Sequence, residues 1–149
     1  SGCKKETTSN TSTPFIKATV NGVSYEFSGS DVMALQDTLG GDFFIACNSG
    51  RFTYNGLYGL GLSFAKHTGN QLYDTTNITS LASVSASFSD SLGITIYLSN
   101  GYSASANVNV LSLDDNFKTA SGTFFATLKN PASGALLPVT NGSFFVKYQ

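Results

Sequence analysis

Side chains able to do acid–base, nucleophilic or metal chemistry are few and widely spaced in this sequence. The only thiols belong to Cys3 and Cys47 and the only imidazole to His67, and sequence spacing does not show a thiol beside the imidazole. The nine acidic residues fall mostly in expected turns, so no facing carboxylate pair for glycoside hydrolysis is predicted. The serine-nucleophile and phosphate-loop motifs are also missing. We therefore expect no enzyme, with no catalytic residue, no metal ligand and no cofactor.

Cys3 has the clearest chemical role. Ser1-Gly2-Cys3 has the form of the end of a bacterial lipobox, where a signal peptide is cleaved and the cysteine is acylated. Residues 4–13 contain no apolar side chain, which is typical of a solvated tether. We expect a lipid anchor and tether over residues 1–13 and one folded domain over residues 14–149. The anchor predicts a secreted lipoprotein of the outer membrane, on either its periplasmic or its surface side.

Charge excludes several classes of partner. The net charge is −1 and charged residues make up 11% of the chain, so there is no basic patch for nucleic acid or for anionic lipid. The predicted membrane contact is the lipid on Cys3 alone. The remaining partners to expect are a glycan or another envelope protein.

Pairs of phenylalanines suggest where a glycan would bind. Adjacent strand residues point to opposite faces, so in Phe124-Phe125 and in Phe144-Phe145 one ring fills the core and the other lies outside. Phe125 and Phe145 would then lie among threonine and serine side chains, as a possible stacking platform for a flat ligand. The alternative is that a loop, a second sheet or another subunit covers them.

Three hydroxyl residues match a pattern for O-glycosylation. Thr38, Thr75 and Ser91 each follow an aspartate in an Asp-Ser/Thr context. We expect sugar at these positions, which the intact mass of the native protein would show.

Cys47 and the Asp114-Asp115-Asn116 segment have structural explanations. Cys47 ends the apolar run that starts at Phe43, so we expect a small buried side chain, with a disulfide to Cys3 as the alternative. The Asp-Asp-Asn segment lacks the further oxygen ligands of a calcium site and is typical of a turn.

Four Asn-Gly pairs, at 21–22, 55–56, 100–101 and 141–142, indicate β-hairpins. A two-residue turn at 21–22 pairs Val20 with Val23 and Lys17 with Glu26, which places opposite charges together. A turn at 141–142 would set Val139 opposite Phe144 and Leu137 opposite Val146. Together with a loop over 130–134, it predicts a three-stranded meander from residue 122 to residue 148.

The middle of the chain is less regular. Val84, Ala86 and Phe88 alternate and are expected to face Ile94, Ile96 and Leu98 across a turn, and a bulge or longer loop is expected at Asn100-Gly101. Residues 58–64 form a strand interrupted by glycines. Asp31 is a candidate cap for one short helix over residues 32–35. The absence of a βαβ rhythm then favours an all-β fold, an antiparallel β-sandwich with a small β-barrel as the alternative.

Both ends of the domain resemble a known family. Thr19-Val20-Asn21-Gly22, Ser121-Gly122-Thr123-Phe124 and Thr140-Asn141-Gly142-Ser143-Phe144 are similar to motifs of Bacteroidetes lipoproteins of unknown function, the DUF6252-type group. The resemblance implies a secreted, β-rich lipoprotein and carries over no activity and no site residue. Together with the composition it predicts a non-catalytic binding module for a glycan or protein. A structural or assembly lipoprotein and a small hydrolase are the alternatives.

Overall fold

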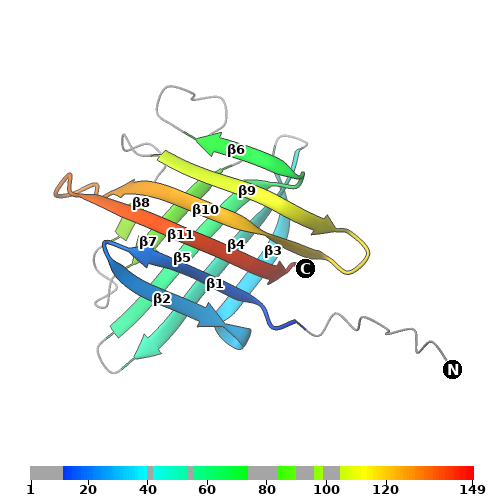
Figure 1. Ribbon diagram of the computed structural model, residues 1–149, viewed down its shortest axis with the longest axis horizontal. Helices are drawn as coiled ribbons and strands as arrows, with labels where there is room; N and C mark the ends of the chain where they lie inside the picture. The colour runs from blue at the N-terminus through cyan, green and yellow to red at the C-terminus, as the bar shows by residue number, and fades with distance from the viewer. Residues whose placement is uncertain (1–11, 40–41, 54–55, 74–83, 90–95, 99–104) are drawn as a thin grey trace, which may run out of the picture.

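The protein is an all-β sandwich. The computed structural model describes residues 12–39, 42–53, 56–73, 84–89, 96–98 and 105–149, and within them there is no α-helix. Two antiparallel sheets pack face to face without closing into a barrel, so the predicted sandwich is confirmed (Figure 1). The strands are β1 (Phe15–Val20), β2 (Val23–Ser28), β3 (Val32–Leu39), β4 (Asp42–Thr53), β5 (Gly56–Ala65), β6 (Gly69–Tyr73), β7 (Ser85–Ser89), β8 (Ile96–Leu98), β9 (Ser105–Asp114), β10 (Thr119–Lys129) and β11 (Leu136–Lys147).

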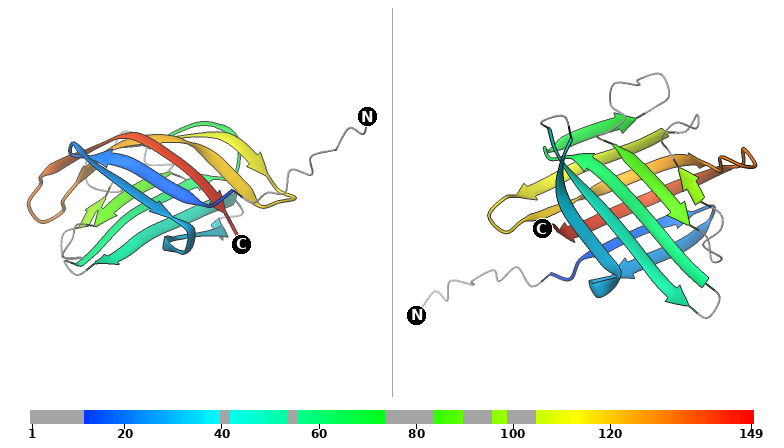
Figure 2. Two further views of the ribbon diagram at one scale, coloured as in Figure 1. Left: turned by 60° about the horizontal axis from the view of Figure 1, so that its bottom comes forward. Right: turned by 180° about the vertical axis from the view of Figure 1, so that it is seen from behind.

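The front sheet has the order β2-β1-β11-β10-β9-β6, and the back sheet has the order β3-β4-β5-β7-β8. Figure 2 shows the two layers from below and from behind. One pairing, Lys129 with Leu98, joins the sheets along one side. On the other side Tyr148 forms a parallel bridge with Ala34, and the Gln36 N–H donates to the Gln149 carbonyl over 2.8 Å. The C-terminus therefore ties the front sheet to the edge of the back sheet.

The core lies between the sheets and is built by strict alternation. On β9, Ala106, Val108 and Val110 are buried while the residues between them are not. Phe64 from the back sheet meets Phe144 from the front sheet with ring centroids 5.0 Å apart. A period of two leaves every second side chain of the front sheet on its outer face. That outer face becomes the surface of interest below.

The first hairpin has the predicted register. Val20 pairs with Val23, and Lys17 pairs with Glu26. Asn21 and Gly22 have φ values of 47° and 82°, the left-handed pair that a type I′ turn requires. The loop over 130–134 is also a turn, in which the Asn130 side chain accepts hydrogen bonds from the backbone N–H groups of Ala132 and Ser133.

The hairpin predicted at Asn141-Gly142 is wrong, because β11 runs through this pair as one strand. β10 pairs Phe124 with Gly142 and Ala126 with Val139, so two residues of β11 face one residue of β10. The same shift occurs against β1. The pair is therefore a β-bulge, and the expected three-stranded meander is a two-stranded hairpin of β10 and β11.

The bulge explains why the hydrophobic pattern looked like a hairpin. Before it the odd-numbered Leu137 and Val139 are buried, and after it the even-numbered Phe144 and Val146 are buried. An extra residue inverts which positions face the core, as a turn would also do. The pattern alone does not distinguish the two.

The short helix predicted over residues 32–35 is also wrong. A single 3₁₀ turn covers Gly29–Asp31, and residues 32–39 form strand β3. Ala34 is buried, whereas Met33 and Leu35 lie on the exposed face. Apolar residues on both faces hid the strand alternation.

The predictions for the middle of the chain are partly confirmed and partly wrong. β7 pairs with β8, but Phe88 lies opposite Tyr97, a register that differs by three positions from the predicted one. β8 pairs with β7 and β10, not with β9. β4 and β5 form a hairpin, but Thr53 pairs with Gly56, so the turn indicated at Asn55-Gly56 is displaced by one residue and Gly56 belongs to β5. Residues 54–55 and the Asn100-Gly101 pair lie outside the described residues. The glycine-interrupted strand over 58–64 is confirmed as part of β5.

Candidate functional site

The outer face of the front sheet carries a row of polar side chains across all six strands. The pairings align one residue per strand, from β6 to β2: Asn70, Asn109, Thr123, Ser143, Lys17 and Glu26. We call this set the polar row. At the usual spacing of neighbouring strands it extends over roughly 24 Å. It offers amide, hydroxyl, ammonium and carboxylate groups along one line.

Aromatic rings flank the polar row on both sides. Phe125 is two residues from Thr123 on β10, and its side chain is 58% exposed. Phe145 is two residues from Ser143 on β11, is half-buried, and pairs with Phe15 of β1. The Lys17 ammonium lies 5.3 Å from the centroid of the Phe15 ring. The two predicted platform residues therefore share one face but lie on opposite sides of the row.

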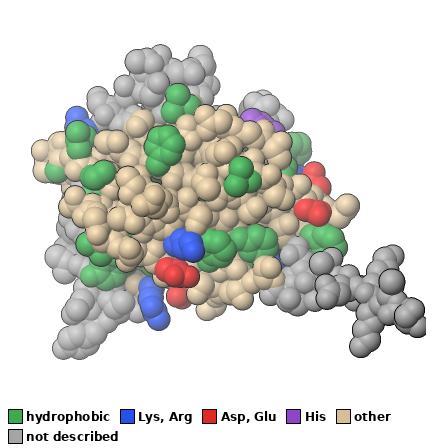
Figure 3. All heavy atoms as spheres, in the orientation of Figure 1, with side chains coloured by type: hydrophobic (Ala, Val, Ile, Leu, Met, Phe, Trp, Pro, Cys, Tyr) green, Lys and Arg blue, Asp and Glu red, His purple; other side chains and the backbone are tan. Residues whose placement is uncertain are grey.

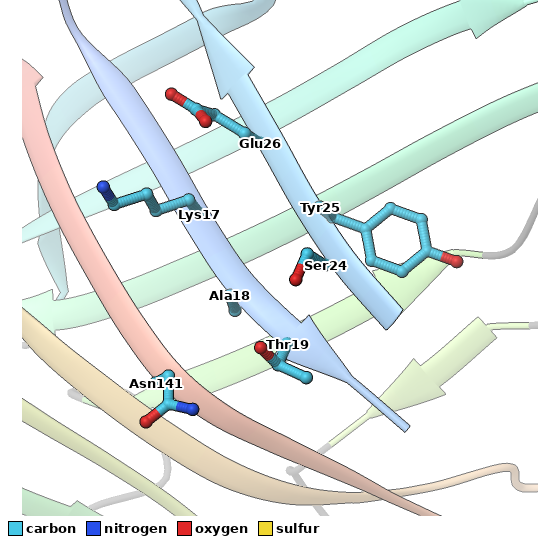
Figure 4. A pocket seen from close by; sticks show the side chains of 7 residues that line it. All are labelled: Lys17, Ala18, Thr19, Ser24, Tyr25, Glu26 and Asn141. Carbon is cyan, nitrogen blue, oxygen red and sulfur yellow. The ribbon is translucent and has the colours of Figure 1, made fainter. Parts of the chain in front are cut away.

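The β11 bulge lies beside the row and adds Asn141. This residue has a φ of 52°, which asparagine tolerates better than most side chains, and it is exposed. With Lys17, Thr19, Ser24 and Glu26 it lines a shallow pocket of about 430 Å³. Figure 4 shows Asn141 approaching from β11 while Lys17, Thr19 and Ser24 come from the β1–β2 hairpin. A bulge that re-aims a side chain is a common device next to a binding site.

This face has little charge. Figure 3 shows a surface made largely of backbone and uncharged polar side chains, with scattered hydrophobic side chains and a close grouping of blue and red near its lower centre. Hydroxyl and amide groups beside rings that are exposed or half-buried can form hydrogen bonds and stacking contacts.

A second polar cluster holds the C-terminus at the β9–β10 turn. The Tyr148 hydroxyl donates to the Asp115 carboxylate over 2.9 Å, and Lys66 forms an ion pair with the same carboxylate. The Lys66 side-chain hydrogen bond, followed by that of Tyr148, lowers the pKa of Asp115. Burial, followed by the bond to Asp115, raises the pKa of Tyr148 to about 12. The cluster stabilises the end of the chain.

The Asp114 carboxylate organises the β9–β10 turn. It accepts hydrogen bonds from the backbone N–H groups of Asn116 and Phe117, over 2.9 and 3.0 Å. The segment is therefore the predicted turn. Over the described part of the chain, no group of three or more His, Cys, Asp or Glu side chains is placed to hold a metal ion.

Cys47 is a buried free thiol, and burial raises its pKa to about 12. It is therefore a packed core side chain, as predicted, and remains protonated at neutral pH. His67 is exposed in the β5–β6 turn. That turn is held by the buried Gln71, whose amide bonds the backbone N–H and carbonyl of Ala65.

Of the predicted modification sites, only Thr38 lies within the described residues. Thr38 is exposed near the end of β3. Cys3, Thr75 and Ser91 lie outside the described residues. Within the described ranges, no helix is long and apolar enough to cross a bilayer.

Sequence reasoning found the rings of this face and missed its amides. Asn70, Asn109 and Asn141 come from three strands far apart in the chain, and only the pairing registers bring two of them into line. Alternation within β9 was the available signal, because Asn107 and Asn109 occupy the positions between buried side chains.

No known relative identifies this face. No protein-family model matches the chain, and neither a curated protein nor a solved structure matches it.

Proposed function

We propose that this protein is a non-catalytic, lipid-anchored envelope module that binds a neutral glycan on the outer face of its front sheet. The observation that carries the proposal is the polar row, with the exposed Phe125 ring on one side of it and the half-buried Phe145 ring on the other. Glycans present hydroxyl edges and apolar ring faces, so a line of hydrogen-bonding groups beside rings complements both. A row that crosses six strands favours a chain of sugars over a single one.

A glycan array followed by calorimetry tests the binding. The wild-type domain should retain one class of neutral glycan, and Phe125→Ala should weaken that binding roughly three- to tenfold through the lost stacking. Phe117→Ala is the matched control, because Phe117 is 62% exposed but lies in the β9–β10 turn. Equal losses in both variants, or no glycan retained at all, would contradict the proposal.

The anchor is the second part of the proposal. It is supported by the Ser1-Gly2-Cys3 motif and the polar segment behind it. Expressed with a signal peptide in a suitable bacterium, the wild-type protein should fractionate with membranes and carry acyl mass on Cys3. Cys3→Ser should move it to the soluble fraction. Membrane association that survives the substitution would count against the anchor.

Sugar on the protein itself remains a prediction. Thr38 has the exposure that a modifying enzyme requires. The intact mass of the native protein should exceed the sum of polypeptide and lipid. A mass equal to that sum would remove the prediction for Thr38, Thr75 and Ser91.

A further inference from the structure

Strand β2 leaves one edge of the front sheet open. It ends the strand order, and among the described strands it pairs only with β1. In a hairpin closed by a two-residue turn, the pair flanking the turn exchanges both hydrogen bonds, and alternate pairs follow. Val23 and Tyr25 therefore bond to β1, whereas the backbone N–H and C=O groups of Ser24 and Glu26 point away from it. These groups are available to a further strand.

A groove runs beside this open edge. It has a volume of about 270 Å³ and is lined by β2 on one side and by Arg51 of β4 and Tyr58 of β5 on the other. Figure 1 shows the ends of β4 and β5 emerging beyond the free edge of β2, and the view from behind in Figure 2 agrees. The back sheet therefore extends past the open edge of β2 and forms the opposite wall of the groove.

One wall of the groove is aromatic. The rings of Tyr25 and Tyr58 lie 5.6 Å apart, and Tyr25 also packs on Phe88 at 5.2 Å. Both tyrosines are partly exposed. Rigid rings held by packing form a surface for one apolar side chain of an incoming segment.

Arg51 supplies the charge of the groove. It is the only arginine in the chain, and its side chain is exposed. Across the described ranges no acidic side chain forms an ion pair with it. Glu26 also lines the groove, but its register sets it opposite Lys17, and Figure 4 shows both side chains extending away from the Tyr25 ring. A guanidinium is a bidentate partner for a carboxylate, which a ligand would have to supply.

We propose that the open edge of β2 binds an extended, acidic peptide segment of a partner protein by strand addition. Main-chain hydrogen bonds to Ser24 and Glu26 hold the segment, one of its carboxylates pairs with Arg51, and one apolar side chain packs on Tyr25 and Tyr58. This site adjoins the glycan face and shares Ser24 and Glu26 with it, but strand addition uses their backbone groups and does not depend on glycan binding.

Peptides selected from a phage-displayed random library against the folded domain are the probe. We expect them to alternate polar and apolar residues and to share one Asp or Glu. Arg51→Glu should lower the affinity of the domain for the selected peptide at least tenfold. Replacing the shared acidic residue of the peptide by lysine should restore binding to that variant. No selected peptide, or no rescue by the charge exchange, would overturn the proposal.

A backbone variant separates strand addition from side-chain contact. The Ser24 N–H points away from β1, so Ser24→Pro removes an outward donor and leaves the β1–β2 ladder intact. It should keep the thermal midpoint within a few degrees and lower peptide affinity at least tenfold, while Phe125→Ala leaves that affinity unchanged. Full peptide binding by a folded Ser24→Pro variant would overturn the proposal. So would dimers of the wild type that Ser24→Pro abolishes, because the occupant would then be a second copy.

Discussion

The same dipeptide has two different structures in this molecule. At Asn21-Gly22 the chain reverses and forms a hairpin, and at Asn141-Gly142 it continues and forms a bulge. The asparagines have nearly equal φ values, 47° and 52°. The glycines differ: Gly22 has a φ of 82° in open space, whereas a Cβ on Gly142 would lie 2.5 Å from the Phe124 carbonyl oxygen.

Neighbouring strands account for the difference. β11 has a partner on each side, β1 and β10, along both halves of its length. Those ladders satisfy the backbone of a continuous strand, so the extra residue is absorbed as a bulge. The sequence near Asn-Gly sets the left-handed asparagine, and the tertiary partners decide between turn and bulge.

The difference also has a consequence for binding. The hairpin brings Lys17 beside Glu26, and the bulge places Asn141 at the same pocket. Variants of the two pairs therefore test both stability and binding.

The largest effect is expected from Gly142→Ala. The added methyl group would overlap the Phe124 carbonyl and ring, which both come from the partner strand β10. We expect a loss of about 3 kcal/mol in the free energy of unfolding, typical of overpacking at a buried position. Denaturant unfolding measures it. A loss below that of Gly22→Ala would mean that the bulge is not packed as described.

Gly22→Ala should cost less, about 1 kcal/mol. No atom lies within 4 Å of the new Cβ, so the cost is the strain of a left-handed φ alone. The same unfolding experiment compares the two glycines directly. Equal costs would show that one mechanism acts at both sites.

Asn141→Gly and Asn21→Gly form a matched pair. Glycine accepts the left-handed conformation, so both should change stability by less than about 1 kcal/mol. Asn141→Gly should also lower the affinity for the glycan roughly three- to tenfold, because it removes a hydrogen bond from an amide that lines the pocket. Asn21 does not line it, so unchanged binding is expected there. Equal affinities of the two variants for the glycan would show that Asn141 is not part of the binding site.

The smallest effect concerns the β9–β10 turn, where Lys118 has a φ of 52° and side chains, not Asn-Gly, fix the loop. Asp115 there has a lowered pKa in the folded state, so its contribution is present above its unfolded pKa and is lost as the pH falls through the folded pKa. Solvent screening keeps that contribution small. Urea unfolding should show a slightly steeper acid loss of stability in the wild type than in Asp115→Asn. Identical pH profiles would contradict the role of the cluster.

Much of the fold could be predicted from the sequence. The first hairpin followed from alternation, turn chemistry and the Lys17–Glu26 charge pair, which all agree. The bulge at Asn141-Gly142 could not be predicted, because a hairpin and a bulge at this position bury the same side chains. The helix expected over residues 32–35 failed because Met33 and Leu35 are apolar on an exposed face.

Only the aromatic residues of the candidate site could be predicted from the sequence. Phe125 and Phe145 each follow a phenylalanine that is buried, so the doublets indicated the outer face. The amides of the polar row depend on the pairing of β6 with β9, which brings Asn70 beside Asn109, about 40 residues further along the chain. Local pattern does not contain that information.

The central claim is that the outer face of the front sheet binds a neutral glycan, and an amide chemical-shift titration tests it most directly. With the best glycan from the array, we predict concentration-dependent shifts centred on Asn109, Thr123 and Ser143, with none along β4 and β5 of the back sheet. Shifts confined to the back sheet, or no shifts at saturating glycan, would contradict the account.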